Sequence, residues 1–421
     1  MKVFENNLIN EKVYKQTLEN GLDIYLLPRK NISKKVIMWG TKFGAVDNDF
    51  SVNGERVTVP DGIAHYLEHK MFEQRSGINA LDTLTSFGVE ANAFTGSTET
   101  VYLYECTNNF YEALEEFMDY VQNPYFTDEN VEKERGIIEQ EIMMYDDYPD
   151  SKIHYNLMKC LYHNNAIKIP VAGTVKTIAD IDKDKLYKIY NTFYVPENMR
   201  MVISGDFEPD EIFEIINKYI IMKKNNNNVV RNYPSEPDSI VQEKIVEQME
   251  VSIPSFLVGY KLEKSDEDLK KSVAIDILNE ILFGKSSKFF ADLYEQNLLY
   301  EPVEMSMDYD RNYAMALIEG ESKNPEKTIE QIKNNIEYYK NNGIKDDIFQ
   351  RIKKDIYGKY LKEYNDLGTI TQRIILNAIK DEKPFEMIDN LQAIDIQYVE
   401  NILNENFDIT KCAYSIIEPK Q

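Results

Sequence analysis

The sequence is poor in several residue types that build common sites. Its 421 residues include only three cysteines, four histidines and one tryptophan. The cysteines, Cys106, Cys160 and Cys412, are odd in number and far apart, which is unlike a disulfide framework or a zinc site made of thiolates. We therefore expect them to be buried, reduced thiols.

Basic charge and long apolar runs are also lacking. Lys and Arg number 48 against 72 Asp and Glu, which gives a net charge of −24. Nucleic-acid binding needs a basic surface, and a membrane span needs about 20 consecutive apolar residues, so neither partner is expected. The first ten residues contain no apolar segment typical of a secretory signal, so we expect a cytoplasmic location. The acidity suits a cationic peptide ligand, although solubility alone also explains an acidic surface.

The length and one polar segment indicate two domains. At roughly 150 residues per domain, the chain is long enough for two or three. A run of four asparagines, Asn225–Asn228, is followed by two prolines, and both features are unfavourable for helices and strands. We therefore predict an N-terminal domain at residues 1–222, a linker at 223–240 and a C-terminal domain at 241–421.

The two halves have similar patterns. Each opens with a strand-like apolar stretch, at residues 34–46 and 252–263, and each contains a pair of amphipathic helices, starting near Ala113 and Thr328. Two helix pairs can also resemble each other by chance. We predict an α+β fold with two similar domains, each a mostly antiparallel β-sheet packed with helices, facing each other across a cleft.

One short helix carries the strongest functional signal. The segment 61–74 has an apolar stripe at helical spacing, formed by Ala64, Leu67 and Met71, and Asp61 is the expected N-cap. His65 and His69 are four residues apart and therefore lie on one face of the helix.

The spacing of these histidines matches a metal site. Two imidazoles one helical turn apart can bind the same tetrahedral zinc ion. Glu68 lies on the same face and can hydrogen-bond a metal-bound water, which gives the inverted motif H-x-x-E-H. The alternative is a helix with two unrelated surface histidines, but only four histidines occur in the chain. We therefore predict one Zn²⁺ per chain, with Glu68 as the general base.

A catalytic zinc site needs a third protein ligand. The predicted helix that follows Asn130 carries Glu134 and Glu141 on its apolar stripe, where a carboxylate is costly unless it is paired or binds a metal. Either glutamate can be the ligand, with the other orienting a ligand histidine. His154 and His163 are weaker alternatives. The stripe itself consists of Val131, Ile138, Ile142 and Tyr145.

At this point the sequence resembles the insulinase/pitrilysin family of zinc metallopeptidases, which includes the mitochondrial processing peptidases. His65-x-x-Glu68-His69 matches the family's inverted motif, and the run HYLEHKMFE is similar to its bacterial YmfH-type branch. The family's pattern E-R-x-x-x-x-x-E is matched from Glu134 to Glu141. The resemblance implies that Glu141 is the third zinc ligand and that Glu134 orients a ligand histidine.

The resemblance also implies a substrate-binding strand. The stretch that begins at Gly88, GVEANAFTGSTETVYLY, is similar to the family's G-x-x-x-N-A-x-T strand, along which the substrate peptide lies. Asn92 matches the asparagine that contacts the substrate backbone, and Ala93 and Phe94 follow it.

The C-terminal half departs from the family pattern. Family members often carry an Arg and a Tyr about seven residues apart in this half, and both contribute to substrate binding. Here Tyr294 stands where the Arg is expected, and Tyr300 matches the Tyr with a spacing one residue short. This departure raises the expectation of a homodimer, or of a heterodimer with a homologous subunit that lacks the metal.

Together these features predict a zinc-dependent endopeptidase, resembling a processing peptidase, that cleaves short or unfolded peptides. The alternative is a peptide-binding or partner-dependent subunit of a two-chain peptidase with little activity alone. The intact H-x-x-E-H motif favours the enzyme, and the missing Arg favours the alternative.

Overall fold

The structure, a computed structural model, describes residues 1–420, which form two compact units. The first unit comprises Met1–Ile142, Ile169–Tyr233 and Leu361–Phe385, and the second comprises Met143–Lys168, Pro234–Tyr360 and residues from Glu386 onward. Each unit is therefore built from separate stretches of the chain. The predicted domain bounds, with a linker at residues 223–240, stay a prediction. The predicted cleft between the halves also stays a prediction.

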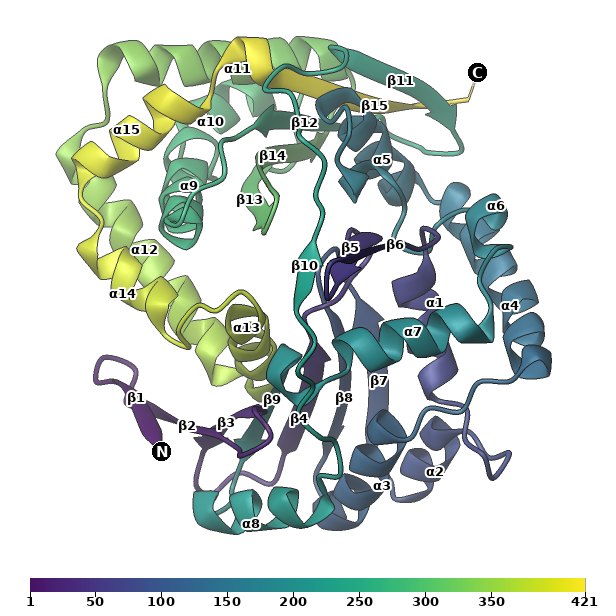
Figure 1. Ribbon diagram of the computed structural model, residues 1–421. Coiled ribbons are helices and arrows are strands. Elements are labelled where there is room, and N and C mark those ends of the chain that lie inside the picture. The colour runs from purple at the N-terminus through teal and green to yellow at the C-terminus, as the bar shows by residue number, and fades with distance from the viewer. Residues whose placement is uncertain (421) are drawn as a thin grey trace. The chain divides into compact units, whose positions relative to one another are not determined.

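The elements that begin in the first unit are named as in Figure 1. Its strands are β1 (Lys2–Asn6), β2 (Glu11–Thr17), β3 (Asp23–Pro28), β4 (Lys35–Thr41), β5 (Asp49–Val52), β6 (Glu55–Thr58), β7 (Glu90–Thr95), β8 (Thr100–Cys106), β9 (Met199–Gly205) and β10 (Val229–Arg231). Its helices are α1 (Ile63–Met71), α2 (Ala80–Ser86), α3 (Phe110–Gln122), α4 (Asp128–Asp146), α6 (Val175–Ile178), α7 (Lys183–Phe193), α8 (Pro209–Tyr219) and α13 (Leu367–Ile379).

The elements that begin in the second unit are fewer. Its strands are β11 (Lys244–Met249), β12 (Ser255–Lys261), β13 (Glu304–Asp310), β14 (Tyr313–Glu321) and β15 (Cys412–Pro419). Its helices are α5 (Pro149–Leu161), α9 (Asp268–Leu282), α10 (Lys288–Glu295), α11 (Pro325–Asn342), α12 (Asp346–Asn365), α14 (Glu386–Ala393) and α15 (Ile396–Asn406).

The main sheet of the first unit places one edge strand beside the metal-site helix. The strand order is β1-β2-β3-β9-β4-β8-β7, and every neighbouring pair is antiparallel except β3 with β9. Strand β7 lies at the end of this sheet and packs against α1. Helix α13 comes from late in the sequence and packs on β4 and β9, as Figure 1 shows.

The second unit has a five-stranded sheet in the order β11-β15-β12-β14-β13. Neighbouring strands in this sheet are antiparallel, except that β11 runs parallel to β15. Helix α5 packs on β15 and β12, and α9 packs on β13. Helices combined with mostly antiparallel sheets confirm the predicted α+β class.

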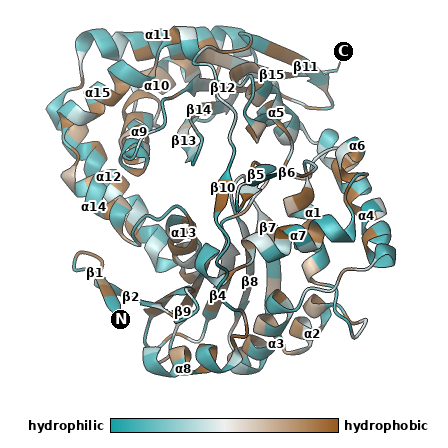
Figure 2. Cartoon of the chain, viewed as in Figure 1, coloured by the Kyte–Doolittle hydropathy of each residue, from teal (hydrophilic) through white to brown (hydrophobic). Residues whose placement is uncertain are grey.

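The core of the first unit explains why its sheet is stable. Every residue of β9 is buried, as expected for a central strand with helices on its faces. Trp39 in the neighbouring β4 is fully buried against Phe117 of α3. In Figure 2 the segment around β10 is mostly hydrophilic, in contrast to this core. The three cysteines are buried free thiols, as predicted.

The segment predicted as a linker is partly ordered against the first unit. Strand β10 pairs antiparallel with β5, which lies in a small three-stranded sheet with β6. Arg231 at the end of β10 forms an ion pair with the fully buried Asp47, with 2.9 Å between Nε and Oδ1. The side chain of Tyr233 donates a hydrogen bond to the same carboxylate. These contacts hold the residues that follow the asparagine run against the first unit.

Helix α1 begins differently from the prediction. Its N-cap is Gly62 in the left-handed region, with φ 91°, and no side chain caps it. Asp61, the predicted cap, instead accepts a hydrogen bond from Asn48 at 2.6 Å. A Cβ at position 62 would lie 2.4 Å from the carbonyl oxygen of Ala172, so both the backbone angle and the close approach require glycine.

The structure has no helix, within residues 1–420, that combines the length and the apolar character needed to cross a membrane.

Candidate metal centre

The two histidines of the motif lie together on helix α1, as their spacing predicts. The ring centroids of His65 and His69 are 4.6 Å apart and their planes are tilted by 56°. Both side chains are partly exposed on one side of a helix that is otherwise largely buried. This side of α1 therefore faces outward from the core and can receive a ligand.

Glu141 from helix α4 completes a group of three. Its Oε1 lies 3.5 Å from Nε2 of His65 and its Oε2 lies 3.4 Å from Nε2 of His69. One ligand atom from each of the three residues lies within 4.8 Å of the others. Two imidazole nitrogens and one carboxylate oxygen are a donor set typical of catalytic zinc, which keeps its fourth position for water or substrate. The residues therefore fit the predicted ion.

Contacts between α1 and α4 hold this geometry. The hydroxyl of Tyr66, which is buried on α1, donates a hydrogen bond to the carbonyl oxygen of Val131. Val131, Ile138 and Ile142 are buried along α4, as the predicted stripe requires. Tyr145 is exposed, so the stripe ends one turn earlier than predicted.

Glu134 contacts His69 on the side of the ring opposite to Glu141. Its Oε1 lies 3.0 Å from Nδ1 of His69, the ring nitrogen that does not face Glu141. A proton on Nδ1 that is donated to this carboxylate leaves Nε2 free to bind a metal. The structure therefore places Glu141 in the group and Glu134 behind it, a choice that helical periodicity left open.

Electrostatic interactions in the centre link Glu134 to His69. Burial raises the pKa of the Glu134 carboxyl, but the hydrogen bond from His69 and the charge of Lys70 outweigh burial, so the net pKa lies below its usual value. Burial lowers the pKa of His69, but Glu134 and Glu141 outweigh it and raise the net pKa. Nδ1 of His65 is buried and makes no hydrogen bond within the described part of the chain.

A buried lysine, Lys70, lies beside the carboxylate of Glu134. Lys70 has 0% of its surface exposed. Its Nζ lies 2.7 Å from the carboxylate of Glu73, 3.0 Å from the carbonyl oxygen of Asn130 and 3.8 Å from Oε2 of Glu134. A buried ammonium is costly unless it is paired and hydrogen-bonded, and these contacts meet that requirement.

Glu68, the predicted general base, is also buried. It is 7% exposed, and its Oε2 accepts a hydrogen bond from the hydroxyl of Thr95, the last residue of β7. Glu68 lies three residues after His65 and is therefore its neighbour on the helix surface. The charge of Glu68, together with Glu134 and Glu141, helps to raise the pKa of His69, so the carboxylate lies near both histidines.

The predicted substrate residues lie on β7, which within residues 1–420 pairs only with β8. Asn92 is exposed and its side chain accepts a hydrogen bond from the backbone N–H of Ala93, while Ala93 and Phe94 are partly buried. An edge strand with unpaired backbone groups can accept an extended peptide.

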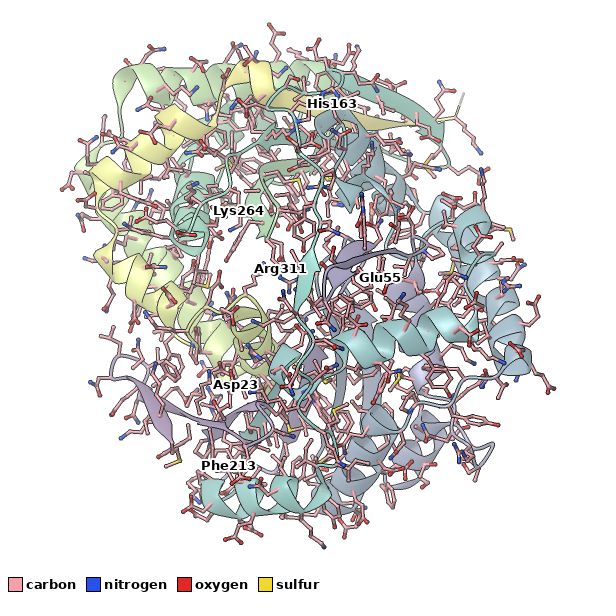
Figure 3. All side chains as sticks on the ribbon, viewed as in Figure 1. Asp23, Glu55, His163, Phe213, Lys264 and Arg311 are labelled. Carbon is pink, nitrogen blue, oxygen red and sulfur yellow. The ribbon has the colours of Figure 1, made fainter. Side chains whose placement is uncertain are left out.

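The other predicted candidates lie in the second unit. His154 is on α5, and His163, which Figure 3 labels, follows that helix in the chain. Neither belongs to the group of three. Tyr294 on α10 is 56% exposed and Tyr300 is 43% exposed. The ammonium of Lys323 lies 5.3 Å from the centroid of the Tyr300 ring.

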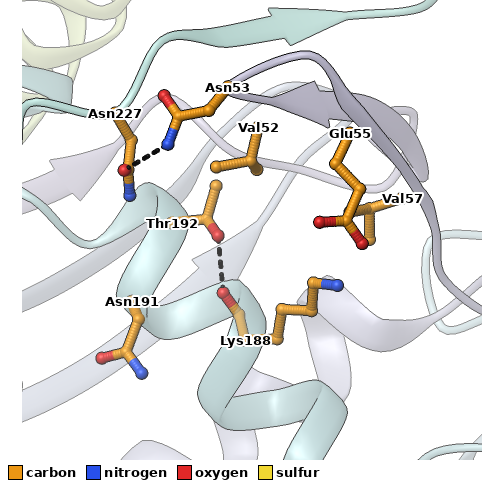
Figure 4. A pocket seen from close by; sticks show the side chains of 8 residues that line it. All are labelled: Val52, Asn53, Glu55, Val57, Lys188, Asn191, Thr192 and Asn227. Atoms are coloured by element: carbon orange, nitrogen blue, oxygen red, sulfur yellow. Dashed lines mark hydrogen bonds between the residues drawn. The ribbon is translucent and has the colours of Figure 1, made fainter.

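A surface hollow of about 410 Å³ lies elsewhere in the first unit, between the β5–β6 hairpin and α7 (Figure 4). Asn53 donates a hydrogen bond to Asn227 at its rim. The hollow is lined by neither histidine nor cysteine, so we assign the predicted zinc chemistry to the metal centre and not to this hollow. The lining residues are Val52, Asn53, Glu55, Val57, Lys188, Asn191, Thr192 and Asn227.

Two neighbours of the centre were not predicted from the sequence. Lys70 lies three residues after the buried Leu67, so its position among the buried residues of the helix was an available signal. Thr95 is the last residue of the G-x-x-x-N-A-x-T match, but its contact with Glu68 had no local signal, because it joins a strand to a helix.

Comparison with known proteins agrees with the site. Residues 55–175 match the family model "Insulinase (Peptidase family M16)", and residues 180–356 match "Peptidase M16 inactive domain". The chain is 34% identical to the uncharacterized zinc protease YmfH of Bacillus subtilis over 100% of both chains. It is 24% identical to YmxG of the same organism, also named an uncharacterized zinc protease, over 94% of this chain and 96% of that one.

Solved structures show the same fold. An M16-like peptidase from Alicyclobacillus acidocaldarius superposes with a TM-score of 0.93 at 29% identity, covering 99% of this chain and 100% of that one. A protease from Helicobacter pylori gives a TM-score of 0.84 at 20% identity, covering 97% and 100%. With full-length similarity to YmfH and matches to both domain models, this chain belongs to the insulinase family of peptidases, peptidase family M16.

Proposed function

We propose that this chain is a zinc-dependent endopeptidase that cleaves short or unfolded peptides, with His65, His69 and Glu141 as the zinc ligands. The observation that carries the proposal is the convergence of these three donors within 4.8 Å. The buried carboxylate of Glu68, on the same side of α1, is the general base. The names of the relatives, which are zinc proteases, support the same class of chemistry.

A bound zinc ion supplies two things to peptide hydrolysis: it polarises the scissile carbonyl and makes its water more acidic. The residues of the chain supply the rest. Glu68 accepts a proton from the attacking water and passes it to the departing amine, which is worth roughly 10²–10⁴-fold in rate. Glu134 accepts the hydrogen bond from Nδ1 of His69 and so keeps the opposite nitrogen directed at the ion.

The substrate is an extended peptide that pairs with the edge of β7. Backbone pairing binds any extended sequence, so it favours short or unfolded substrates over folded ones. Asn92, Ala93 and Phe94 lie on this strand and contact the peptide. With a net charge of −24, the chain should prefer cationic peptides. Cleavage rates on matched Lys-rich and Glu-rich peptides test this preference, and equal or faster cleavage of the Glu-rich set removes it.

The decisive experiment combines metal analysis with peptide digestion. Wild type should contain about one zinc per chain and cleave an unstructured peptide library. Glu68→Gln should keep the zinc and lose cleavage by at least about 10²-fold. Glu129→Gln, which removes an exposed carboxylate from α4, is the matched control and should behave as wild type. If His65→Ala retains full zinc, the ligand assignment is wrong.

A second candidate function is a peptide-binding subunit that needs a partner chain for activity. Tyr294 occupies the position where relatives in this family often carry an Arg, and this favours the alternative. A zinc-loaded wild type that binds peptides but cleaves none supports the second function. Light scattering during size-exclusion chromatography then shows whether the chain forms a homodimer, and co-purification tests for a homologous subunit without the metal motif.

A further inference from the structure

A hydroxyl from the sheet contacts the proposed general base. Thr95 is the last residue of the edge strand β7, and its side chain donates a hydrogen bond to Oε2 of Glu68 on α1. A hydrogen bond to a carboxylate is short and strong compared with one between neutral groups. The carboxylate is therefore held by an element other than its own helix.

The neighbouring strand offers this hydroxyl a second, weaker partner. Thr100, the first residue of β8, pairs directly with Thr95, and their hydroxyl oxygens are 3.4 Å apart. Thr100 is fully buried and donates its own proton to the carbonyl oxygen of Phe43 at 3.0 Å. A threonine hydroxyl has only one proton, so Thr100 can accept from Thr95 but cannot donate to it. The proton of Thr95 therefore has two possible acceptors, and the carboxylate of Glu68 is both closer than Thr100 and charged, so it is the stronger acceptor.

We propose that Thr95 is a positioning residue that fixes the orientation of Glu68 for proton transfer. This inference rests on the proposed peptidase function. With Oε2 held by Thr95, the carboxylate keeps one orientation, and its second oxygen is left to accept the proton from water. General-base catalysis depends on such geometry, because the accepting oxygen must be within hydrogen-bond reach of the proton. Strand β7 thereby orients the base as well as carrying the substrate residues.

The rival explanation is that Thr95 only stabilises the β7–β8 pair or binds substrate. Four variants separate these roles. Thr95→Val keeps the shape and removes the hydroxyl, Thr95→Ser keeps the hydroxyl, and Thr95→Ala serves if the Val side chain does not fit. Thr58→Val makes the same substitution at an exposed position of β6 in the same unit and is the matched control.

The zinc-loaded full-length variants are assayed for kcat and KM on one peptide. Thr95→Val should lower kcat about 10–100-fold, the range expected for loss of a hydrogen bond to a charged group, with KM within about threefold of wild type. Thr95→Ser should restore kcat to within about threefold, and Thr58→Val should match wild type. Zinc content and urea unfolding should be the same in all of them.

A binding measurement excludes a direct role in substrate recognition. In a Glu68→Gln background, where cleavage is lost, Thr95→Val should leave the affinity for the same peptide within about threefold, because Thr95 acts on the base. A larger loss of affinity assigns Thr95 to substrate binding and overturns the inference.

The remaining outcomes are also decisive. If wild type cleaves the peptide and Thr95→Val is equally fast, the inference is wrong and the peptidase function stands. If Thr95→Ser is as slow as Thr95→Ala, the hydroxyl is not the active feature. Loss of zinc or of stability in step with kcat makes the role structural. If zinc-loaded wild type cleaves no peptide, the proposed function fails and this inference fails with it.

Discussion

Replacing the buried Lys70 with methionine should destabilise the first unit strongly. The lysine has no exposed surface, and its Nζ contacts the carboxylate of Glu73 at 2.7 Å and the carbonyl oxygen of Asn130 at 3.0 Å. Glu134 lies 3.8 Å away and is itself only 9% exposed. Methionine fills a similar volume but cannot donate a hydrogen bond, so Lys70→Met leaves these oxygens without their cation.

The size of the effect follows from these contacts. Removing one partner of a buried ion pair costs about 3–5 kcal/mol. The side chain of Glu73 keeps 27% of its surface in water, which reduces the cost. The lost hydrogen bond to Asn130 adds about 1–3 kcal/mol, and the relieved cost of burying an ammonium offsets part of the sum. We therefore expect a loss of about 2–4 kcal/mol in the free energy of unfolding.

The assay uses the only tryptophan in the sequence. Trp39 is fully buried in the first unit, so its fluorescence during urea unfolding reports on that unit even if the two units unfold separately. Chelator-treated protein is used so that metal binding does not contribute to stability. At a slope of about 2–3 kcal/mol per molar urea, the midpoint should fall by about 0.7–2 M.

The matched control is Lys133→Met, which removes the same charge from an exposed residue next to Glu134. It should change stability by no more than about 0.5 kcal/mol. If the midpoint of Lys70→Met equals that of the control, the contacts of the buried ammonium do not stabilise the unit and the reasoning is refuted.

Three further predictions follow from the structure. Glu134→Gln should weaken zinc affinity about 10–100-fold in a chelator competition, and unchanged affinity means that Glu134 does not orient His69. Gly62→Ala should cost about 1–3 kcal/mol in the same fluorescence assay, because its φ is 91° and a Cβ would meet a carbonyl oxygen at 2.4 Å. Burial raises the pKa of Glu236, but Lys261 and backbone N–H groups outweigh it and lower the net value. Its stabilisation is therefore complete above the usual glutamate pKa and lost as the pH falls through the lowered one. Unfolding followed by circular dichroism should show wild type more stable than Glu236→Gln at pH 7, with a gap that closes on acidification; a gap that widens contradicts the assignment.

The local part of the site could be predicted from the sequence, and the distant part only in outline. His65 and His69 lie one helical turn apart, so their meeting follows from α-helix geometry. Periodicity placed Glu134 and Glu141 on one stripe but could not choose between them. The structure separates them, because Glu141 faces Nε2 of both histidines whereas Glu134 faces Nδ1 of His69. The contact of Thr95 with Glu68 could not be predicted, because only the packed structure brings β7 to α1.

The fold shows the same division. The α+β class follows from strand and helix patterns along the chain. The placement of two helices could not be predicted from these patterns. Helix α5 belongs to the second unit and packs on β12 and β15, which come much later in the chain, whereas α13 belongs to the first unit and packs on β4 and β9, which come much earlier. The prediction of Asp61 as the N-cap of α1 was wrong, because the cap also depends on a distant segment. The close approach of Ala172 requires the glycine at position 62, which is the observed N-cap.

The most direct test of the proposed zinc site is anomalous diffraction at the zinc absorption edge from crystals of the zinc-loaded protein. We expect one strong peak per chain at about 2.0–2.2 Å from Nε2 of His65, Nε2 of His69 and a carboxylate oxygen of Glu141. A peak coordinated by other residues, or these three side chains turned apart with no peak between them, would contradict it.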